Sequence, residues 1–250
     1  LARFAAEGLR ENETTWLRAL DVVDARQRSA VVDEIRERWG AVDVLVNNAG
    51  VAYRSVLEHV HDDERLAQMD VNFLGPMELV RLVLPGMRAQ RSGRIVNVSS
   101  VGGMMAMPTM AVYSASKWAL EGASEALWYE VRPFGIHVTL VQPGFIHSPG
   151  FMNTRYTQAS RASLDDARAP YHAHYEHMGP FIARLMDLAR ATPESIAVRM
   201  RRVIEQRSPP LRAPVTLDAR VFSTLRRWLP RRLYHHVLYR NLPNVRSWGS

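Results

Sequence analysis

Residues 42–50 read Val-Asp-Val-Leu-Val-Asn-Asn-Ala-Gly, a short apolar run that ends in two amides and a glycine. An apolar run of this length is typical of a strand that is buried on both faces of a parallel sheet. Residues 94–99 and 137–142 repeat the pattern, and each run is followed by polar or glycine-rich residues. The three runs predict parallel strands of one sheet, with polar residues gathered at their carboxyl ends.

The segments around these strands have the periodicity of helices and of further strands. Strands that alternate with helices predict an α/β fold, a doubly wound parallel sheet, in which ligands bind beyond the carboxyl ends of the strands. The other expected elements are the end of a helix at 1–12, a strand at 16–23, helices ending at Trp39 and at about 63–89 and 113–132, a helix beginning after Thr192, and a last strand at 211–215.

Composition and charge are those of one soluble globular domain with a basic end. The 250 residues are 47% hydrophobic, contain no cysteine, and include no apolar run of the roughly 20 residues that span a membrane. Residues 199–250 hold twelve arginines against Glu205 and Asp218, a net charge of +10, and the remainder carries −3 of the total +7. We expect a cytoplasmic protein that binds no nucleic acid. The tail over 217–250 has two open interpretations: contact with an anionic membrane, or packing on its own domain or on a partner subunit.

Lys117 is the only lysine among 32 Lys and Arg residues, so the other 31 are arginines. A position that keeps lysine in such a chain indicates a need for a compact ammonium instead of a planar guanidinium. Tyr113 lies four residues earlier, and on a helix this spacing places the phenol and the ammonium on one face. Taken alone, the pattern more often marks an exposed lysine beside a half-buried tyrosine.

Ser100 follows the second apolar run and precedes Tyr113 by thirteen residues. A hydroxyl, a phenol and an ammonium placed together form a proton-transfer group for a carbonyl or an alcohol. A phenol has a pKa of about 10, and lowering it by about 3 units takes roughly 4 kcal/mol, which a nearby ammonium and a cofactor cation together supply. The sequence therefore predicts that Tyr113 exchanges a proton and that Ser100 hydrogen-bonds the reacting oxygen.

These residues occur in the order found in a known family: the chain resembles the short-chain dehydrogenases/reductases, most strongly over about residues 13–148. The resemblance implies that Ser100, Tyr113 and Lys117 are catalytic, and that Asn72 orders a helix kink and a relay water. It implies a bound NAD or NADP. The matching cofactor-binding residues, besides Tyr113 and Lys117, are Asp21, Val22, Asn47, Ala49, Gly50, Pro143, Gly144, Ile146 and Ser148.

The run that follows Ser100 and the ending at 209–215 are particularly similar to steroid and retinol dehydrogenases. The implied function is hydride transfer between nicotinamide and a lipophilic secondary alcohol or ketone, by a homo-oligomer, with residues 151–190 as a cover over the site. Met105, Met107 and Phe151 would then lie near the substrate, although methionines in such positions equally often fill a core. A metal is not expected, because no regular spacing brings His172, His174 and His177 onto one face with a carboxylate.

The family's glycine-rich turn, which holds the cofactor pyrophosphate at a helix N-terminus, has no counterpart here, since Gly8 and Gly40 stand alone near the start. The resemblance implies that 1–250 is an incomplete single domain without the first strand, first helix and second strand, on the order of 40 residues. We expect the chain alone to be unstable and to bind the dinucleotide weakly. The alternative function is a non-catalytic binding or scaffold protein on a decayed dehydrogenase fold.

Overall fold

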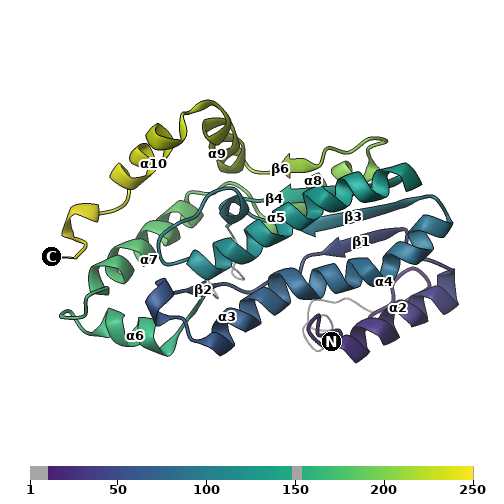
Figure 1. The fold of residues 1–250 in the computed structure, drawn as a ribbon, viewed down its shortest axis with the longest axis horizontal. Coiled ribbons are helices and arrows are strands. Elements are labelled where there is room, and N and C mark those ends of the chain that lie inside the picture. Colours follow the sequence, from purple (N-terminus) through teal and green to yellow (C-terminus); the bar gives the residue numbers. More distant parts are fainter. Residues whose placement is uncertain (1–10, 148–153, 250) are drawn as a thin grey trace.

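A computed structural model describes residues 11–147 and 154–249 of the chain. Its centre is a parallel sheet with the strand order β1-β3-β4-β6, and β2 and β5 form a separate two-stranded parallel sheet (Figure 1). The predicted α/β fold with a parallel sheet is confirmed. The strands are β1 (Val44–Asn47), β2 (Tyr53–Arg54), β3 (Gly93–Val98), β4 (Ile136–Gln142), β5 (Arg155–Tyr156) and β6 (Arg212–Pro214).

Helices cover both faces of the sheet. On one face, Ile95 of β3 and Val138 of β4 pack in one apolar cluster with Leu79 and Leu127, which belong to α4 (Gly75–Ala89) and α5 (Ala111–Val131). Figure 1 shows these two helices crossing in front of the strands, with α2 (Ala25–Trp39) beside α4. Because neighbouring residues of a strand point to opposite faces, Val96 packs on the other side, against α8 (Pro193–Glu205).

The segment expected to cover the site, residues 151–190, contains two helices, α6 (Gln158–Asp165) and α7 (His172–Asp187). The basic tail forms α9 (Leu217–Trp228) and α10 (Arg231–Arg240). Short 3₁₀ turns lie at Leu57–His59, Val101–Gly103, Arg132–Phe134 and Val245–Ser247. Among the described residues, no helix is both long enough and apolar enough to cross a bilayer.

The helix expected over 63–89 is interrupted by one irregular turn. It consists of α3 (Asp62–Met69), a π-helical turn at Asp70–Leu74 and α4. A π turn inserts an extra residue into the helical repeat and is often found at functional sites. Here it places Asn72 in the interior, where the side chain is fully buried.

The strand expected over 16–23 is wrong, because residues 16–20 form no ladder and residues 22–23 form a turn. In the part of the chain that the structure describes, β1 is an edge strand, and Val44 and Val46 are each 39% exposed. Leu20 and Val22 instead pack on the cluster formed by α2 and α4, and the Val22 carbonyl accepts a 2.6 Å hydrogen bond from Arg28. Leu20 and Val22 are thus partly buried in the main apolar cluster, whereas Val23 is 41% exposed.

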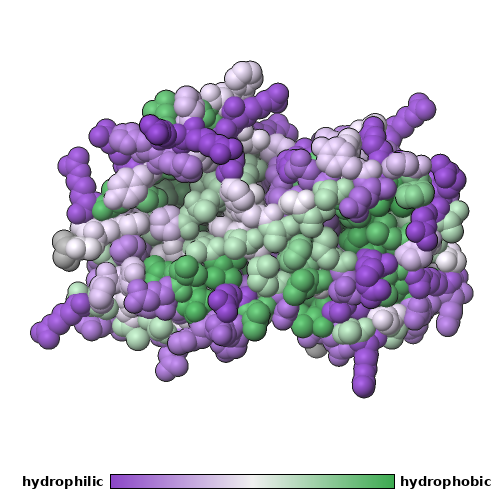
Figure 2. Space-filling model, viewed as in Figure 1, coloured by the Kyte–Doolittle hydropathy of each residue, from purple (hydrophilic) through white to green (hydrophobic). Residues whose placement is uncertain are grey.

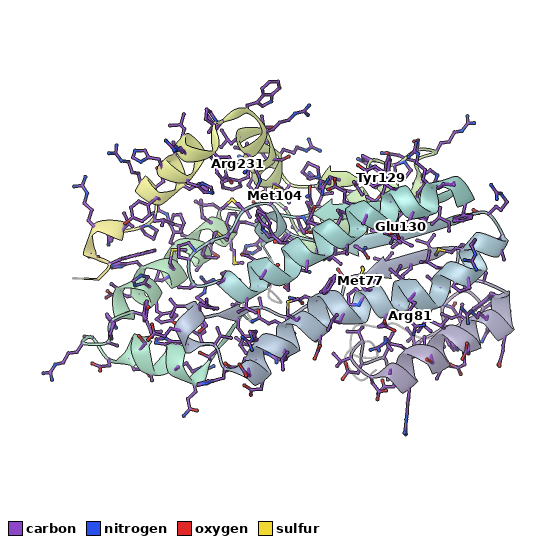
Figure 3. The ribbon with its side chains drawn as sticks, viewed as in Figure 1. Met77, Arg81, Met104, Tyr129, Glu130 and Arg231 are labelled. Carbon is purple, nitrogen blue, oxygen red and sulfur yellow. The ribbon has the colours of Figure 1, made fainter. Side chains whose placement is uncertain are left out.

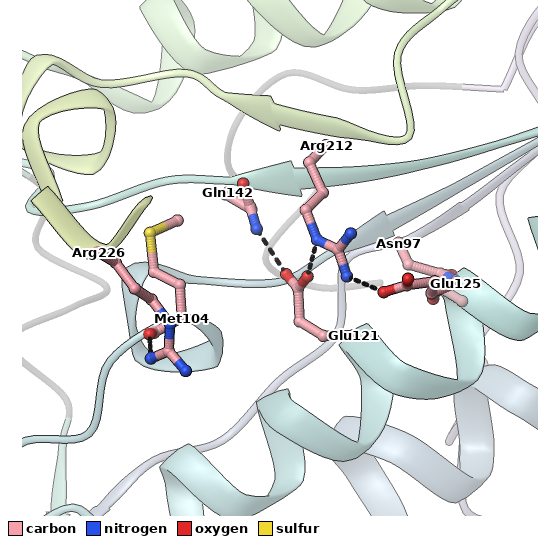
Figure 4. A network of polar contacts seen from close by, with 8 residues as sticks. Asn97, Met104, Glu121, Glu125, Gln142, Arg212 and Arg226 are labelled. Atoms are coloured by element: carbon pink, nitrogen blue, oxygen red, sulfur yellow. Dashed lines mark hydrogen bonds and ion pairs between the residues drawn. The ribbon is translucent and has the colours of Figure 1, made fainter. Parts of the chain in front are cut away.

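A polar network attaches α5 to the sheet (Figure 4). Glu121 accepts hydrogen bonds from Gln142 of β4 and from Arg212 of β6, both at 2.8 Å. Arg212 also pairs with Glu125, one turn further along α5, at 2.6 Å. Arg226 of α9 donates to the Met104 carbonyl and stacks on Trp118 of α5. These contacts fix the helix that carries Tyr113 and Lys117.

Candidate active site

A cavity of about 370 Å³ opens at the carboxyl ends of β1, β3 and β4. This is the edge of the sheet at which the sequence predicts a ligand, because carboxyl ends of parallel strands meet there. Its walls combine glycines, hydroxyl side chains, an amine and an arginine. They are formed by Asn48, Gly50, Val51, Ala52, Val98, Ser99, Ser100, Tyr113, Lys117, Pro143, Gly144, Ile146, Thr154 and Arg155.

Tyr113 and Lys117 lie one helical turn apart on α5 and both line this cavity. The Lys117 side chain is buried, and its Nζ donates a 2.9 Å hydrogen bond to the Val98 carbonyl. Burial lowers the pKa of the Lys117 ammonium to about 8, and the Glu121 carboxylate one turn further opposes this effect. The ammonium is therefore held at the end of β3, facing the space that a ligand would fill.

The Tyr113 phenol differs from the sequence expectation. Burial raises its pKa above the usual value of 10, and a hydrogen bond with Ser100 opposes the rise. The protein's own groups thus keep the phenol protonated, because loss of hydration outweighs the stabilisation of the phenolate. The expected lowering of the pKa by Lys117 is not found in the protein alone, and the tyrosine is set to donate a proton.

Ser100 is buried between the end of β3 and the 3₁₀ turn at Val101–Gly103, and its Oγ accepts a 3.0 Å hydrogen bond from the Gly102 amide. The same hydroxyl is hydrogen-bonded to the Tyr113 phenol, so an acceptor placed between the two groups would have to take over the Ser100 hydrogen. A Cβ on Gly102 would lie 2.9 Å from Cε1 of Tyr113 and 3.5 Å from Ser100 Oγ. Only glycine therefore allows the backbone to approach the tyrosine ring this closely.

Asn72 connects the π turn to the cavity wall. Its Oδ1 accepts from the Val51 amide at 2.9 Å, and its Nδ2 donates to the Val51 carbonyl at 2.8 Å and to Ser116 Oγ at 3.0 Å. A Cβ on Gly50 would lie 3.3 Å from Asn72 Oδ1 and 3.8 Å from Lys117 Nζ. The loop after β1 is thereby clamped between the π turn and α5.

The loop after β4 is held from the start of α9, a contact that the sequence pattern did not predict. The Gly144 amide donates to Thr216 Oγ1 at 2.9 Å, and the Phe145 amide donates to Asp218 Oδ2 at 2.7 Å. Pro143, Gly144 and Ile146 line the cavity as expected, and a side chain on Gly144 would meet the Asp218 carboxylate. The first turn of α9 therefore shapes one wall of the site.

Several of the expected cofactor residues lie elsewhere. Asp21 accepts a hydrogen bond from the nearby Val23 amide, and Val22 packs on the core, so neither lines the cavity. Asn47 is buried and bonded to Asn97 at 2.8 Å, which joins β1 to β3. Ala49 is exposed and absent from the cavity wall, where its neighbour Asn48 takes part instead.

Met105 and Met107, both expected near the substrate, do not line the same cavity. Met107 lines a second, smaller cavity of about 30 Å³ that shares Ser100, Tyr113 and Gly144 with the larger one. Met105 belongs to an apolar cluster with Tyr234 of α10, on which Met107 also packs, but Met105 does not line the small cavity. Ser148 and Phe151 lie outside the described residues.

Residues that the sequence did not mark complete the small cavity. They are Arg54, Val101, Gly102, Met110, Ser114, Phe145, Met178 and Ile182. Two of these come from α7, within the segment expected to cover the site. Their sequence signal is weak because a buried side chain from a remote element carries no local pattern. His172 and His177 of α7 both approach the Glu176 carboxylate, at 3.7 and 3.8 Å, and His174 contacts Trp248. Among the described residues, however, no group of three His, Asp or Glu is placed to hold a metal ion.

The groups that line the larger cavity fit the nicotinamide–ribose end of a dinucleotide. The Lys117 ammonium has three hydrogens and, within the described ranges, one acceptor, so it can hold the hydroxyls of a ribose. Ser99 Oγ also faces the cavity, buried and without a partner among the described residues. Gly50 and Gly144 line the same cavity as Tyr113. When bound, such a cofactor donates or accepts a hydride.

A parallel α/β fold with a serine, a tyrosine and a lysine around a cavity at the strand ends defines a nucleotide-dependent oxidoreductase. A family model described as short chain dehydrogenase matches residues 1–159. The chain is 33% identical over 225 residues to a 3-ketodihydrosphingosine reductase of Bacteroides thetaiotaomicron, covering 88% of this chain and 80% of that one. The chain belongs to the short-chain dehydrogenase family.

Solved structures agree with this assignment. A short-chain dehydrogenase from Streptomyces avermitilis matches with a TM-score of 0.73 and 30% identity, over 94% of this chain and 84% of that one. A gluconate 5-dehydrogenase from Burkholderia cenocepacia, in complex with NADP and tartrate, matches with a TM-score of 0.52 and 31% identity, over 68% of this chain and 62% of that one. The predictions of an oxidoreductase and of NAD or NADP as its cofactor are confirmed.

Proposed function

We propose that the protein reduces a ketone, and oxidises the corresponding secondary alcohol, on a lipophilic substrate. In the reductive direction a bound reduced nicotinamide would supply the hydride for the carbonyl carbon, and the Tyr113 phenol would give its proton to the carbonyl oxygen. Ser100 donates a hydrogen bond to the same oxygen, and Lys117 holds the ribose. The observation that carries the proposal is that Ser100, Tyr113 and Lys117 line one cavity.

A role for Tyr113 as proton donor in the reductive direction is consistent with its burial, which raises the pKa of the phenol. Asn72 positions the loop after β1 beside this group through its bonds to Val51. A lipophilic substrate is supported by the methionine, phenylalanine and isoleucine side chains that face Tyr113 in the smaller cavity. The Bacteroides relative is itself named for a keto substrate.

The test is a Tyr113→Phe variant, assayed on a panel of lipophilic ketones with NADH and with NADPH. Loss of a positioned general acid is expected to lower kcat by about 100- to 10 000-fold. Tyr239→Phe on α10 is the control, because Tyr239 is 59% exposed and lines neither of the cavities that contain Tyr113. Unchanged turnover by Tyr113→Phe would reject the assigned role.

We propose in addition that α9 contacts an anionic membrane surface. Leu217, Val221, Leu225 and Trp228 follow helical spacing and are 77%, 46%, 37% and 75% exposed. Arginines flank this apolar stripe and match the charge of anionic headgroups. Sedimentation with anionic and neutral vesicles at low and high salt tests the contact, with Trp228→Ser as the variant and Leu57→Ser, at an equally exposed apolar position, as the control. Absence of binding to anionic vesicles at low salt ends the proposal.

A homo-oligomer is the remaining proposal. Figure 2 shows apolar side chains over the middle of the face that α4 and α5 form, and Figure 3 places Met77 and Arg81 of α4 and Tyr129 and Glu130 of α5 there. Leu74 and Tyr129 are 48% and 62% exposed. A second copy packed on this face would bury them, and the mass measured by light scattering would then exceed that of one chain.

A further inference from the structure

Arg54 is a charged residue enclosed in the interior of the protein. It is 6% exposed and lies on β2. The backbone is fixed there by the pairing of β2 with β5 and by a 2.7 Å hydrogen bond from the Ser55 amide to the Thr109 carbonyl. A guanidinium keeps its charge at all ordinary pH values. Its burial is therefore costly unless an anion or several acceptors surround it.

The described residues provide no such partner. Arg54 Nη1 is buried without a hydrogen-bond acceptor there, and none of the ion pairs among those residues includes Arg54. Burial lowers the pKa of the Arg54 guanidinium, and the one opposing influence is the Tyr156 phenol. A protonated phenol carries no charge, so none of the described residues neutralises the positive charge. Residues 148–153 contain no Asp or Glu.

Arg54 lines the small cavity beside the catalytic group. That cavity, of about 30 Å³, is also lined by apolar side chains such as Met110, Phe145 and Met178, and by the hydroxyl groups of Ser100, Tyr113 and Ser114. Ser100 and Tyr113 line both this cavity and the larger one, so a molecule that reacts at Tyr113 has the Arg54 cavity directly beside it. The small volume admits a compact group, and the apolar walls exclude the water that would weaken a charge pair.

We propose that Arg54 is a specificity-determining residue that binds a carboxylate of the substrate, so that the enzyme acts on an oxo acid or hydroxy acid. This inference rests on the proposed oxidoreduction at Tyr113. A carboxylate supplies the missing negative charge, and its two oxygens match the planar fork of a guanidinium. A neutral ketone would leave the buried charge unpaired and would bind less well.

The first measurement compares an acid with its neutral ester. Benzoylformate and methyl benzoylformate present the same reacting carbonyl, and only the acid offers a carboxylate. We expect the ratio of their kcat/KM values to favour the acid in the wild type and to fall about 10- to 100-fold in Arg54→Met, the loss expected for one charged hydrogen-bonded pair. Arg54→Lys keeps the charge without the fork and should fall between. Arg65→Met, at an exposed arginine of α3, is the control and should match the wild type.

The second measurement does not depend on turnover. Phenylacetate should bind the wild type in calorimetry and bind Arg54→Met at least about tenfold more weakly, and the apo variant should melt at a higher temperature because an unpaired buried charge is gone. If phenylacetate binding depends on Arg54 but neither benzoylformate nor its ester is reduced, the carboxylate subsite is supported and the proposed function is refuted. An acid-to-ester ratio and a phenylacetate affinity that are equal in wild type and Arg54→Met would overturn the subsite, even in an active enzyme. A lower melting temperature of the variant would also count against it.

Discussion

Lys117 Nζ donates a 2.9 Å hydrogen bond to the backbone oxygen of Val98, the last residue of β3. This bond places an ammonium at the carboxyl end of a central strand, where the cavity begins. The ammonium is buried, and its pKa is lowered to about 8. Placing the Lys117 ammonium where the proposed chemistry requires it therefore costs folding free energy.

Replacement of Lys117 by Met should change the dependence of stability on pH. The difference between the ordinary pKa of 10.5 and about 8 corresponds to about 3 kcal/mol, at about 1.36 kcal/mol per unit. Between these two pH values the unfolded chain keeps a proton that the folded chain has released, so the wild type gains stability as pH rises. Below pH 8 the whole cost is present. Lys117→Met lacks this cost.

Urea unfolding of both proteins at pH 7 and pH 10.5 measures the effect of Lys117. The quantity of interest is the free energy of unfolding of Lys117→Met minus that of the wild type. This difference should be about 3 kcal/mol larger at pH 7 than at pH 10.5, because the variant is relatively more stable at pH 7. Loss of the bond to Val98 shifts the difference equally at the two pH values and leaves its change with pH unaffected. A stability difference that does not vary with pH would show that the ammonium is not buried in its charged form. Catalytic activity of the variant should be lost at both pH values.

Replacement of Asn72 by Ala should reduce both stability and activity. The side chain makes three buried hydrogen bonds, and their loss is expected to cost about 2–4 kcal/mol. Asn97→Ala is the matched control: Asn97 is equally buried, and it bonds Asn47 and Ser124 away from the cavity. Both variants should melt earlier, and only Asn72→Ala should lose turnover when the two are assayed below their melting temperatures. Equal losses of turnover would contradict a specific role for Asn72.

Replacement of Gly102 by Ala should impair catalysis. The added methyl group would lie 2.9 Å from the Tyr113 ring, so the ring or the turn must move. Movement of the Tyr113 ring from its reacting position is expected to lower kcat by about tenfold or more. Gly122→Ala on α5 is the control, since a Cβ there meets no atom within 4 Å. It should keep full turnover and gain about 0.5–1 kcal/mol from the better helix former, as measured by urea unfolding.

Replacement of Arg212 by Leu should loosen the joint between α5 and β6. Arg212 pairs with the buried Glu121 and with Glu125, at 2.8 and 2.6 Å. Since the arginine side chain is 40% exposed, we expect a loss of about 1–2 kcal/mol instead of the full cost of a buried pair. Arg201→Leu removes an exposed pair with Glu205 and should change stability by less than about 0.5 kcal/mol. Thermal denaturation compares the two, and an equal effect would refute the structural role of the Arg212 network.

The parts of the fold that the sequence predicted well have strong local patterns. The strands at 94–99 and 137–142 and the helix at 113–132 appear within a few residues of their expected bounds. The predicted strand at 16–23 failed because a strand also requires a neighbour, and its apolar residues pack on helices instead. The apolar periodicity did not show the interruption at Asp70–Leu74, because a single π turn leaves the pattern on either side intact, and only the family resemblance implied a helix kink at Asn72.

By itself, the sequence determined the parallel α/β architecture and brought Ser100, Tyr113 and Lys117 to one edge of the sheet, because strand and helix periods depend on neighbouring residues alone. Only the tertiary structure decided the direction of the Tyr113 pKa, the anchoring of Gly144 and Phe145 by α9, and the placement of an unpaired Arg54 beside the reacting group. Each of these depends on burial or on contact between remote segments. Hydration and packing in a folded protein are properties of the assembled interior, and no local pattern of residues records them.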